Sequence, residues 1–344
     1  MKKTIGVLVF IILLLVLFFP YQGEIYKDGG TKLYSSLSYQ YVEFNNLEGC
    51  KKSKLVFFKP KKDYKYFEDL LCKKGDSESS SEGQLKNITP FSYSNLTDQK
   101  TQDFIKNTLA KYEISEKNID SYFYYVDYFN DAVEKEGLTK GGFKEIKNFS
   151  RDGDYPLYLE KLENKNIDFM GTNCRISSFT LFKDFVNVEN FTKEVSQVLT
   201  FDEGAINNFP EKIFSEKDKE KFYTFFAGIS TPLVKDKQIH LKNIKKYFKE
   251  HNIKFNTKPG FSVISMFNHS DLDNVLFIGH IGVLLEAEGK FVFLEKLSFD
   301  LPYQAVIFDK KSEVKEYFMK KYGDMTTPET AKPFLMENDK EFGE

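Results

Sequence analysis

The stretch Gly171-Thr172-Asn173-Cys174-Arg175-Ile176-Ser177-Ser178-Phe179-Thr180-Leu181-Phe182 decides the fold, because it predicts a tight turn that runs directly into a helix. The apolar residues that recur at helical spacing are Ile176, Phe179, Phe182, Phe185 and Val186. Thr172 or Asn173 can cap the helix, since a short polar side chain there accepts a hydrogen bond from a free N–H of the first turn. We therefore expect Cys174 at or next to a helix N-terminus.

A cysteine at such a position can serve as a nucleophile. The helix dipole and the free N–H groups of the first turn favour the thiolate over the thiol. The backbone N–H of Cys174 is then a candidate donor to an oxyanion. The alternative is a buried cysteine that only packs, which is the commoner role of a free cysteine.

A second stretch, from Asn274 to Leu285, predicts a strong strand with His280 between Gly279 and Gly282. Glu288-Gly289 is predicted to form a two-residue hairpin turn, with the return strand at residues 291–297.

In this register Ala287 pairs with Lys290 and His280 faces Leu297, which makes Glu295 the diagonal neighbour of His280 on the same face. Lys296 then points to the other face. A three-residue loop would instead favour Lys296 or Ser298.

Cys174, His280 and Glu295 are therefore the candidate catalytic residues. The thiolate attacks a carbonyl, the imidazole protonates the leaving amine, and the carboxylate orients the ring. Asn173 and Arg175 are the candidate substrate-binding residues. The guanidinium of Arg175 can either clamp a substrate carboxylate or form a structural ion pair. No cofactor is expected, and no cysteine or histidine spacing typical of a metal site is found.

The order of cysteine, histidine and a later acceptor resembles the papain-like clan, including NlpC-type cell-wall peptidases. We expect an α+β fold of that type, with the cysteine helix packed on an antiparallel sheet that carries the histidine. Four further segments are similar to an uncharacterised family of exported Gram-positive proteins, domain-of-unknown-function family 4300, from about Asn87 to Phe308. They are Tyr93–Leu96, Gly171–Arg175, Phe277–Leu285 and Glu295–Ala305. The resemblance implies an exported globular domain and brings no activity.

Composition and the N-terminus suggest a compartment. The 344 residues carry a formal net charge of -2, so nucleic acid is not an expected partner. Met1-Lys2-Lys3 precedes an unbroken apolar run at residues 5–19, typical of a signal peptide or a short membrane anchor over residues 1–22. We therefore expect an extracytoplasmic location, either secreted or anchored at a Gram-positive cell surface. In an oxidising compartment Cys50 and Cys72 can pair, which leaves Cys174 free.

The remaining domain organisation follows from composition. We predict a small strand-containing stalk at residues 23–75, a Ser-rich linker at 76–86, the globular domain at 87–325 and a loose polar tail at 326–344. Periodicity predicts helices that open near Asn95 and Asn118, and others at residues 157–162, 189–199, 216–226, 240–251 and 313–322. Strands are expected at residues 261–267, 274–285, 291–297 and 301–308.

Two functions from different classes follow. The first is a cysteine amidase or peptidase that acts on a peptide or a peptidoglycan stem, either by hydrolysis or by acyl transfer. The second is a surface binding module in which Cys174 and His280 are core residues. The separation of the Cys174 sulfur from the His280 ring distinguishes them, because a proton passes directly only over hydrogen-bond distance.

Overall fold

The computed structural model describes residues 22–25, 31–35, 39–45, 51–57, 91–147, 149, 155–324 and 326–343. The chain divides into two compact units, residues 1–88 and residues 89–344. The first contains an antiparallel sheet with its strands in chain order. These strands are β1 (Gln22–Ile25), β2 (Lys32–Ser35), β3 (Tyr39–Asn45) and β4 (Lys51–Phe57). Leu33 and Val42 pair across β2 and β3, and both are buried.

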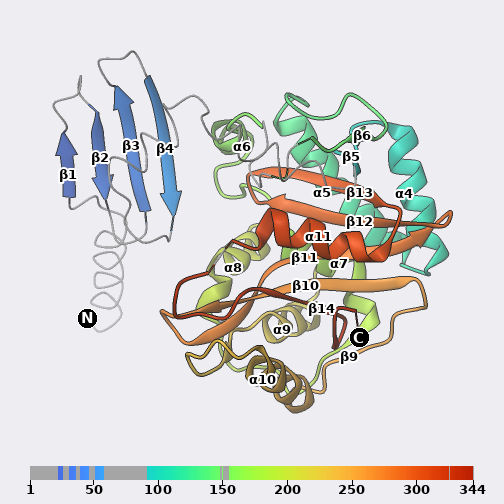
Figure 1. Ribbon diagram of the computed structural model, residues 1–344. Helices are drawn as coiled ribbons and strands as arrows, with labels where there is room; N and C mark the ends of the chain where they lie inside the picture. The colour runs from blue at the N-terminus through green and yellow to red at the C-terminus, as the bar shows by residue number, and fades with distance from the viewer. Residues whose placement is uncertain are drawn as a thin grey trace, which may run out of the picture. The chain divides into compact units, whose positions relative to one another are not determined.

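The second unit is built on a large antiparallel sheet in the order β15-β14-β10-β11-β12-β13-β5-β6, with β8 paired to β11 (Figure 1). Its strands are β5 (Ser92–Ser94), β6 (Lys144–Glu145), β8 (Ile229–Ser230), β10 (Phe261–Ser270), β11 (Val275–Ala287), β12 (Lys290–Ser298), β13 (Leu301–Phe308), β14 (Phe334–Glu337) and β15 (Lys340–Glu341). A separate short pair joins β7 (Val186–Asn187) to β9 (Lys254–Phe255).

Helices cover this sheet on both faces. They are α4 (Gln99–Lys111), α5 (Glu116–Ala132), α6 (Leu159–Lys165), α7 (Cys174–Phe182), α8 (Thr200–Asn207), α9 (Glu216–Phe225), α10 (Lys237–Glu250) and α11 (Lys311–Tyr322), with 3-10 turns η1 (Lys183–Phe185) and η2 (Gln197–Leu199). The expected combination of helices with an antiparallel sheet is confirmed.

Neighbouring residues of β12 show which helices lie on which face. Glu295 is bonded by Tyr317 and Tyr322 of α11, whereas the Lys296 amine lies over the Phe129 ring of α5. Successive side chains of a strand point to opposite faces, so α11 and α5 cover opposite faces of the sheet. The core between these layers is rich in aromatic rings, and Phe179 of α7 contacts four other phenylalanine rings.

Two predicted elements are wrong. The helix expected at residues 189–199 is shifted, since only Gln197–Leu199 is helical there and α8 begins at Thr200. The tail expected to be loose contains β14, which pairs with β10 from Phe334 to Glu337. This strand has only four residues and no long alternation, so its pattern was too short to be recognised.

The prediction of a transmembrane protein is wrong for the residues that the structure describes. None of the helices among them is both long enough and apolar enough to cross a bilayer. The apolar run at residues 5–19, on which the signal and anchor predictions rested, lies outside the described residues, as do Cys50 and Cys72.

Candidate functional site

The start of helix α7 has the geometry that the sequence predicts. Asn173 is the N-cap, with extended backbone, and its side-chain oxygen accepts a 3.0 Å hydrogen bond from the Ile176 N–H. Cys174 is therefore the first residue of the helix, and its own N–H has no partner within the helix. Cys174 is buried, with 8% of the residue exposed.

Asp202 of α8 fixes the two residues that flank Cys174. Its Oδ1 accepts from Asn173 Nδ2 at 2.8 Å and from Arg175 Nε at 2.9 Å, and its Oδ2 accepts from Arg175 Nη2 at 2.5 Å. Of the two roles expected for Arg175, the structure shows the structural ion pair, which is formed with Asp202. A contact of Asn173 or Arg175 with substrate stays a prediction.

The turn before the helix is fastened to β13. Thr172 Oγ1 lies 2.9 Å from Ser177 Oγ and 2.5 Å from the Tyr303 hydroxyl. Gly171 has φ of 118°, a conformation that favours glycine, and a Cβ there would lie 3.3 Å from the Phe299 carbonyl oxygen. Short side-chain bonds and a glycine therefore hold Cys174 at a defined place above the sheet.

His280 lies where β11 is irregular. The predicted hairpin register is confirmed from Ala287–Lys290 to Val283–Leu294, and the pairing of β11 with β12 ends there. The expected pairing of His280 with Leu297 is therefore wrong. On the other side of β11, the register with β10 shifts, because His280 pairs with Met266 and Ile278 pairs with Phe267.

Gly279 is the extra residue of this β-bulge. A bulge changes the direction of the adjacent side chain, and here that side chain belongs to His280.

His280 meets Glu295 across the opening between β11 and β12. His280 Nε2 lies 2.7 Å from Glu295 Oε2, and both side chains are almost fully buried. Tyr322 donates to the same carboxylate oxygen at 2.7 Å, while Tyr317 donates to Oε1. The Tyr322 ring also stacks on the His280 ring, with centroids 3.8 Å apart and planes inclined by 19°. Helix α11 thereby fixes both the carboxylate and the imidazole.

Cys174 and His280 are neighbours, and each shifts the pKa of the other through its charge and through side-chain hydrogen bonding. Since Nε2 faces Glu295, the nitrogen left for the thiol is Nδ1. Burial alone would raise the pKa of the Cys174 thiol, but the charge and hydrogen bond of His280, together with Arg175, hold that pKa below its usual value. Burial would likewise lower the pKa of His280, but Cys174 and Glu295 raise it above the usual value. These opposite shifts favour a thiolate–imidazolium pair.

The Glu295 carboxylate is itself stabilised as an anion. Its burial would raise the pKa, yet Lys321, His280 and the Tyr317 hydroxyl lower it. On the other face of β12, Lys296 is fully buried, donates to the carbonyl oxygens of Phe299 and Leu301, and lies 3.7 Å above the Phe129 ring. Burial there holds the pKa of Lys296 well below its usual value.

The structure therefore brings Cys174, His280 and Glu295 into one connected set, and their catalytic role stays a prediction. Asp202, Tyr317 and Tyr322 were missed by sequence reasoning. A lone Asp on a helix and tyrosines on the closing helix carry no local signal of their partners. Among the described residues, no group of three or more His, Cys, Asp or Glu side chains could hold a metal ion.

Comparison with known proteins gives a family and no activity. No curated protein and no solved structure matches the chain. The family model that matches is described as a domain of unknown function, DUF4300, so the earlier hydrolase, signal and cell-wall descriptions receive no support from it. The match extends over residues 92–342, which include α7, β11, β12 and α11. The chain belongs to the DUF4300 family.

Proposed function

We propose that this chain is a cysteine-dependent enzyme that cleaves amide bonds in a peptide, with Cys174 as nucleophile. The observation that carries the proposal is that Cys174, the first residue of a helix, neighbours His280, whose Nε2 lies 2.7 Å from Glu295 Oε2. A nucleophile, a base within hydrogen-bond reach and a group that orients the base are the parts that nucleophilic catalysis needs.

The geometry supports a two-step reaction. The Cys174 thiolate attacks the amide carbonyl, and the free N–H of Cys174 at the helix start can donate to the oxyanion. The His280 imidazolium gives its proton to the leaving amine, which leaves a thioester on Cys174. Water then attacks the thioester, and neutral His280 takes a proton from that water. The carboxylic acid is released, and the free enzyme is restored. An amine in place of water would give acyl transfer by the same residues.

The arrangement of elements is consistent with a papain-like site. The cysteine begins a helix that packs against an antiparallel sheet, and the histidine and its partner lie on strands of that sheet. Asn173 and Arg175 are engaged with Asp202, so in this proposal they hold the helix start.

The competing function is a binding module in which these residues only pack. The observation that favours it is burial, because Cys174 is 8% exposed and His280 is 3% exposed. A nucleophile must be reached by its substrate, so accessibility to a peptide-like electrophile separates the two functions.

The test is covalent labelling with a peptide-like acyloxymethyl ketone, followed by mapping of the modified residue. The proposal predicts modification at Cys174 that is lost in Cys174→Ala and strongly slowed in His280→Ala. His240→Ala is the matched control, since His240 is also buried but bonds to Thr231 and Val234. Absence of labelling at Cys174 in the folded chain would favour the binding module.

A further inference from the structure

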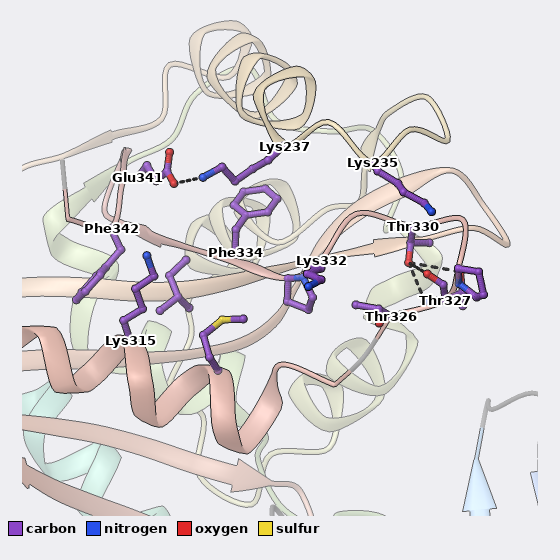
Figure 2. A pocket seen from close by; sticks show the side chains of 14 residues that line it. Lys235, Lys237, Lys315, Thr326, Thr327, Thr330, Lys332, Phe334, Glu341 and Phe342 are labelled. Atoms are coloured by element: carbon purple, nitrogen blue, oxygen red, sulfur yellow. Dashed lines mark hydrogen bonds and ion pairs between the residues drawn. The ribbon is translucent and has the colours of Figure 1, made fainter. Parts of the chain in front are cut away.

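A cavity separate from the Cys174 site lies between helices α10 and α11, over strand β14 (Figure 2). Its volume is about 540 Å³, within the range that holds a small organic ligand. The residues that line it belong to the start of α10 and the stretch before it, to α11, and to the segment that runs from Thr326 through β14 to Phe342. No residue of the Cys174–His280–Glu295 set is among them.

The lining is strongly basic, although the chain as a whole is slightly acidic. It contains four lysines and one carboxylate, Glu341, so four minus one gives a formal charge of +3. Lys237 and Glu341 form an ion pair with each other, shown by the dashed line in Figure 2. Within the part of the chain that the structure describes, Lys235, Lys315 and Lys332 have no ion-pair partner. Three unneutralised ammonium groups around one cavity favour an anionic occupant.

The floor and one wall are apolar. Phe334 and Leu335 of β14, Met319 of α11 and Phe342 after β15 contribute this surface. An inorganic ion would leave it uncovered, whereas an anion that carries an apolar group would bury it and gain hydrophobic free energy.

The opposite wall, residues 326–333, is held in place by its own hydrogen bonds. Thr327 Oγ1 donates to Asp271 Oδ2 at 3.0 Å, the Thr327 N–H donates to Thr330 Oγ1 at 2.9 Å, and the Ala331 N–H donates to His269 Nδ1 at 3.2 Å. These bonds tie the wall to β10 and to the turn after it. The cavity is therefore preformed, which lowers the cost of ordering on binding.

From these observations we infer that the cavity is a binding site for a small organic anion with an apolar group. The lysines recognise the charge, and β14 with Met319 and Phe342 receives the apolar part. The cavity shares no residue with the Cys174–His280–Glu295 set, so this inference does not depend on the proposed amide cleavage.

The test uses two probes that share one ring system, the sulfonate 1-anilinonaphthalene-8-sulfonate and the uncharged N-phenyl-1-naphthylamine. Fluorescence titration of the full chain should give tighter binding of the sulfonate. The variant Lys315→Gln with Lys332→Gln should weaken sulfonate binding about five- to tenfold, since each exposed charge contact is worth a few-fold, and should leave the uncharged probe unchanged.

The control variant is Lys242→Gln with Lys246→Gln, two exposed lysines of α10 that do not line the cavity. It should bind both probes as the unmodified chain does. An unchanged circular dichroism spectrum and melting temperature would show that the cavity variant is folded. The inference is overturned if the cavity variant titrates like the unmodified chain, if the control weakens binding equally, or if the uncharged probe binds as tightly as the sulfonate.

Discussion

Each residue of the Cys174 set is held in place by partners outside the set. Asp202 fixes the residues on either side of Cys174 through three hydrogen bonds. Tyr317 and Tyr322 saturate the Glu295 carboxylate, and Tyr322 also stacks on His280. A side chain with this many contacts keeps one rotamer, which is what a preorganised site requires.

Replacement of Glu295 by Gln should lower the pKa of His280, because the carboxylate that stabilises the imidazolium is lost. The histidine signals of isotope-labelled protein give this pKa directly by NMR, and the chain has only four histidines. Glu286→Gln, at an exposed position of the same hairpin, is the matched control and should leave the titration of His280 unchanged. An unchanged His280 titration in Glu295→Gln would show that the carboxylate does not stabilise the imidazolium.

At the scale of elements, the site depends on the point where β11 and β12 separate. The strands pair only up to Val283 and Leu294, and the bulge at Gly279 changes the direction of His280. Gly279 is also required sterically, since a Cβ there would lie 2.3 Å from Asn268 Nδ2. Asn268 is buried and cannot move without cost.

The substitution Gly279→Ala should therefore destabilise the fold by about 1–3 kcal/mol, the usual effect of overpacking a filled core. The matched control is Gly204→Ala in α8, where a Cβ meets nothing within 4 Å. That change should stabilise the chain by about 0.4–1 kcal/mol, because alanine loses less backbone entropy in a helix. Urea unfolding midpoints measure both, and equal midpoints for the two variants would refute the steric role of Gly279.

Local patterns predicted much of this architecture. The turn chemistry of Glu288-Gly289 gave the hairpin register, and the spacing of apolar residues after Asn173 gave α7 with its cap, because both signals lie within a few residues of each other. The separation of β11 from β12 could not be predicted, since the mostly apolar run of residues 275–285 continues through it. Asp202, Tyr317 and Tyr322 were missed because their partners are far along the chain, and a sequence pattern carries no information on such contacts.

At the scale of the whole molecule, the chain is organised as two compact units, residues 1–88 and 89–344. The Ser-rich sequence at residues 76–86 precedes the division at Ile88 and Thr89. The family match begins at residue 92 and ends at residue 342, so it coincides with the second unit. The Cys174 set and the basic cavity both belong to this unit, and α11 contributes Tyr322 to the first and Lys315 to the second.

Limited proteolysis should therefore cut first between Asp76 and Gly83, because a polar, Ser-rich stretch close to a domain boundary is a preferred site of cleavage. Mass spectrometry of the products should identify a stable fragment that begins near Thr89 and still labels at Cys174. Early cleavage within residues 275–297, which form the central hairpin, would contradict this organisation.

If Cys174 is a thiolate paired with the His280 imidazolium, the pH dependence of its alkylation will differ from that of an ordinary cysteine. An ordinary cysteine has a pKa of about 8.5 and is almost wholly protonated at a pH of about 6. The pKa of Cys174 is lowered and that of His280 is raised, and both shifts favour the ion pair over the neutral pair. The thiolate is lost as the pH falls through the lowered pKa of Cys174.

Iodoacetamide should therefore label Cys174 at a pH of about 6 well ahead of Cys50 and Cys72 in the reduced, folded chain, with the sites read by peptide mapping. In His280→Ala the labelling of Cys174 should shift toward alkaline pH, because the imidazolium that stabilises the thiolate is gone and only Arg175 and the helix dipole still favour it. Labelling of Cys174 only after denaturation, at mildly acidic and mildly alkaline pH alike, would contradict the account and identify Cys174 as a packing residue.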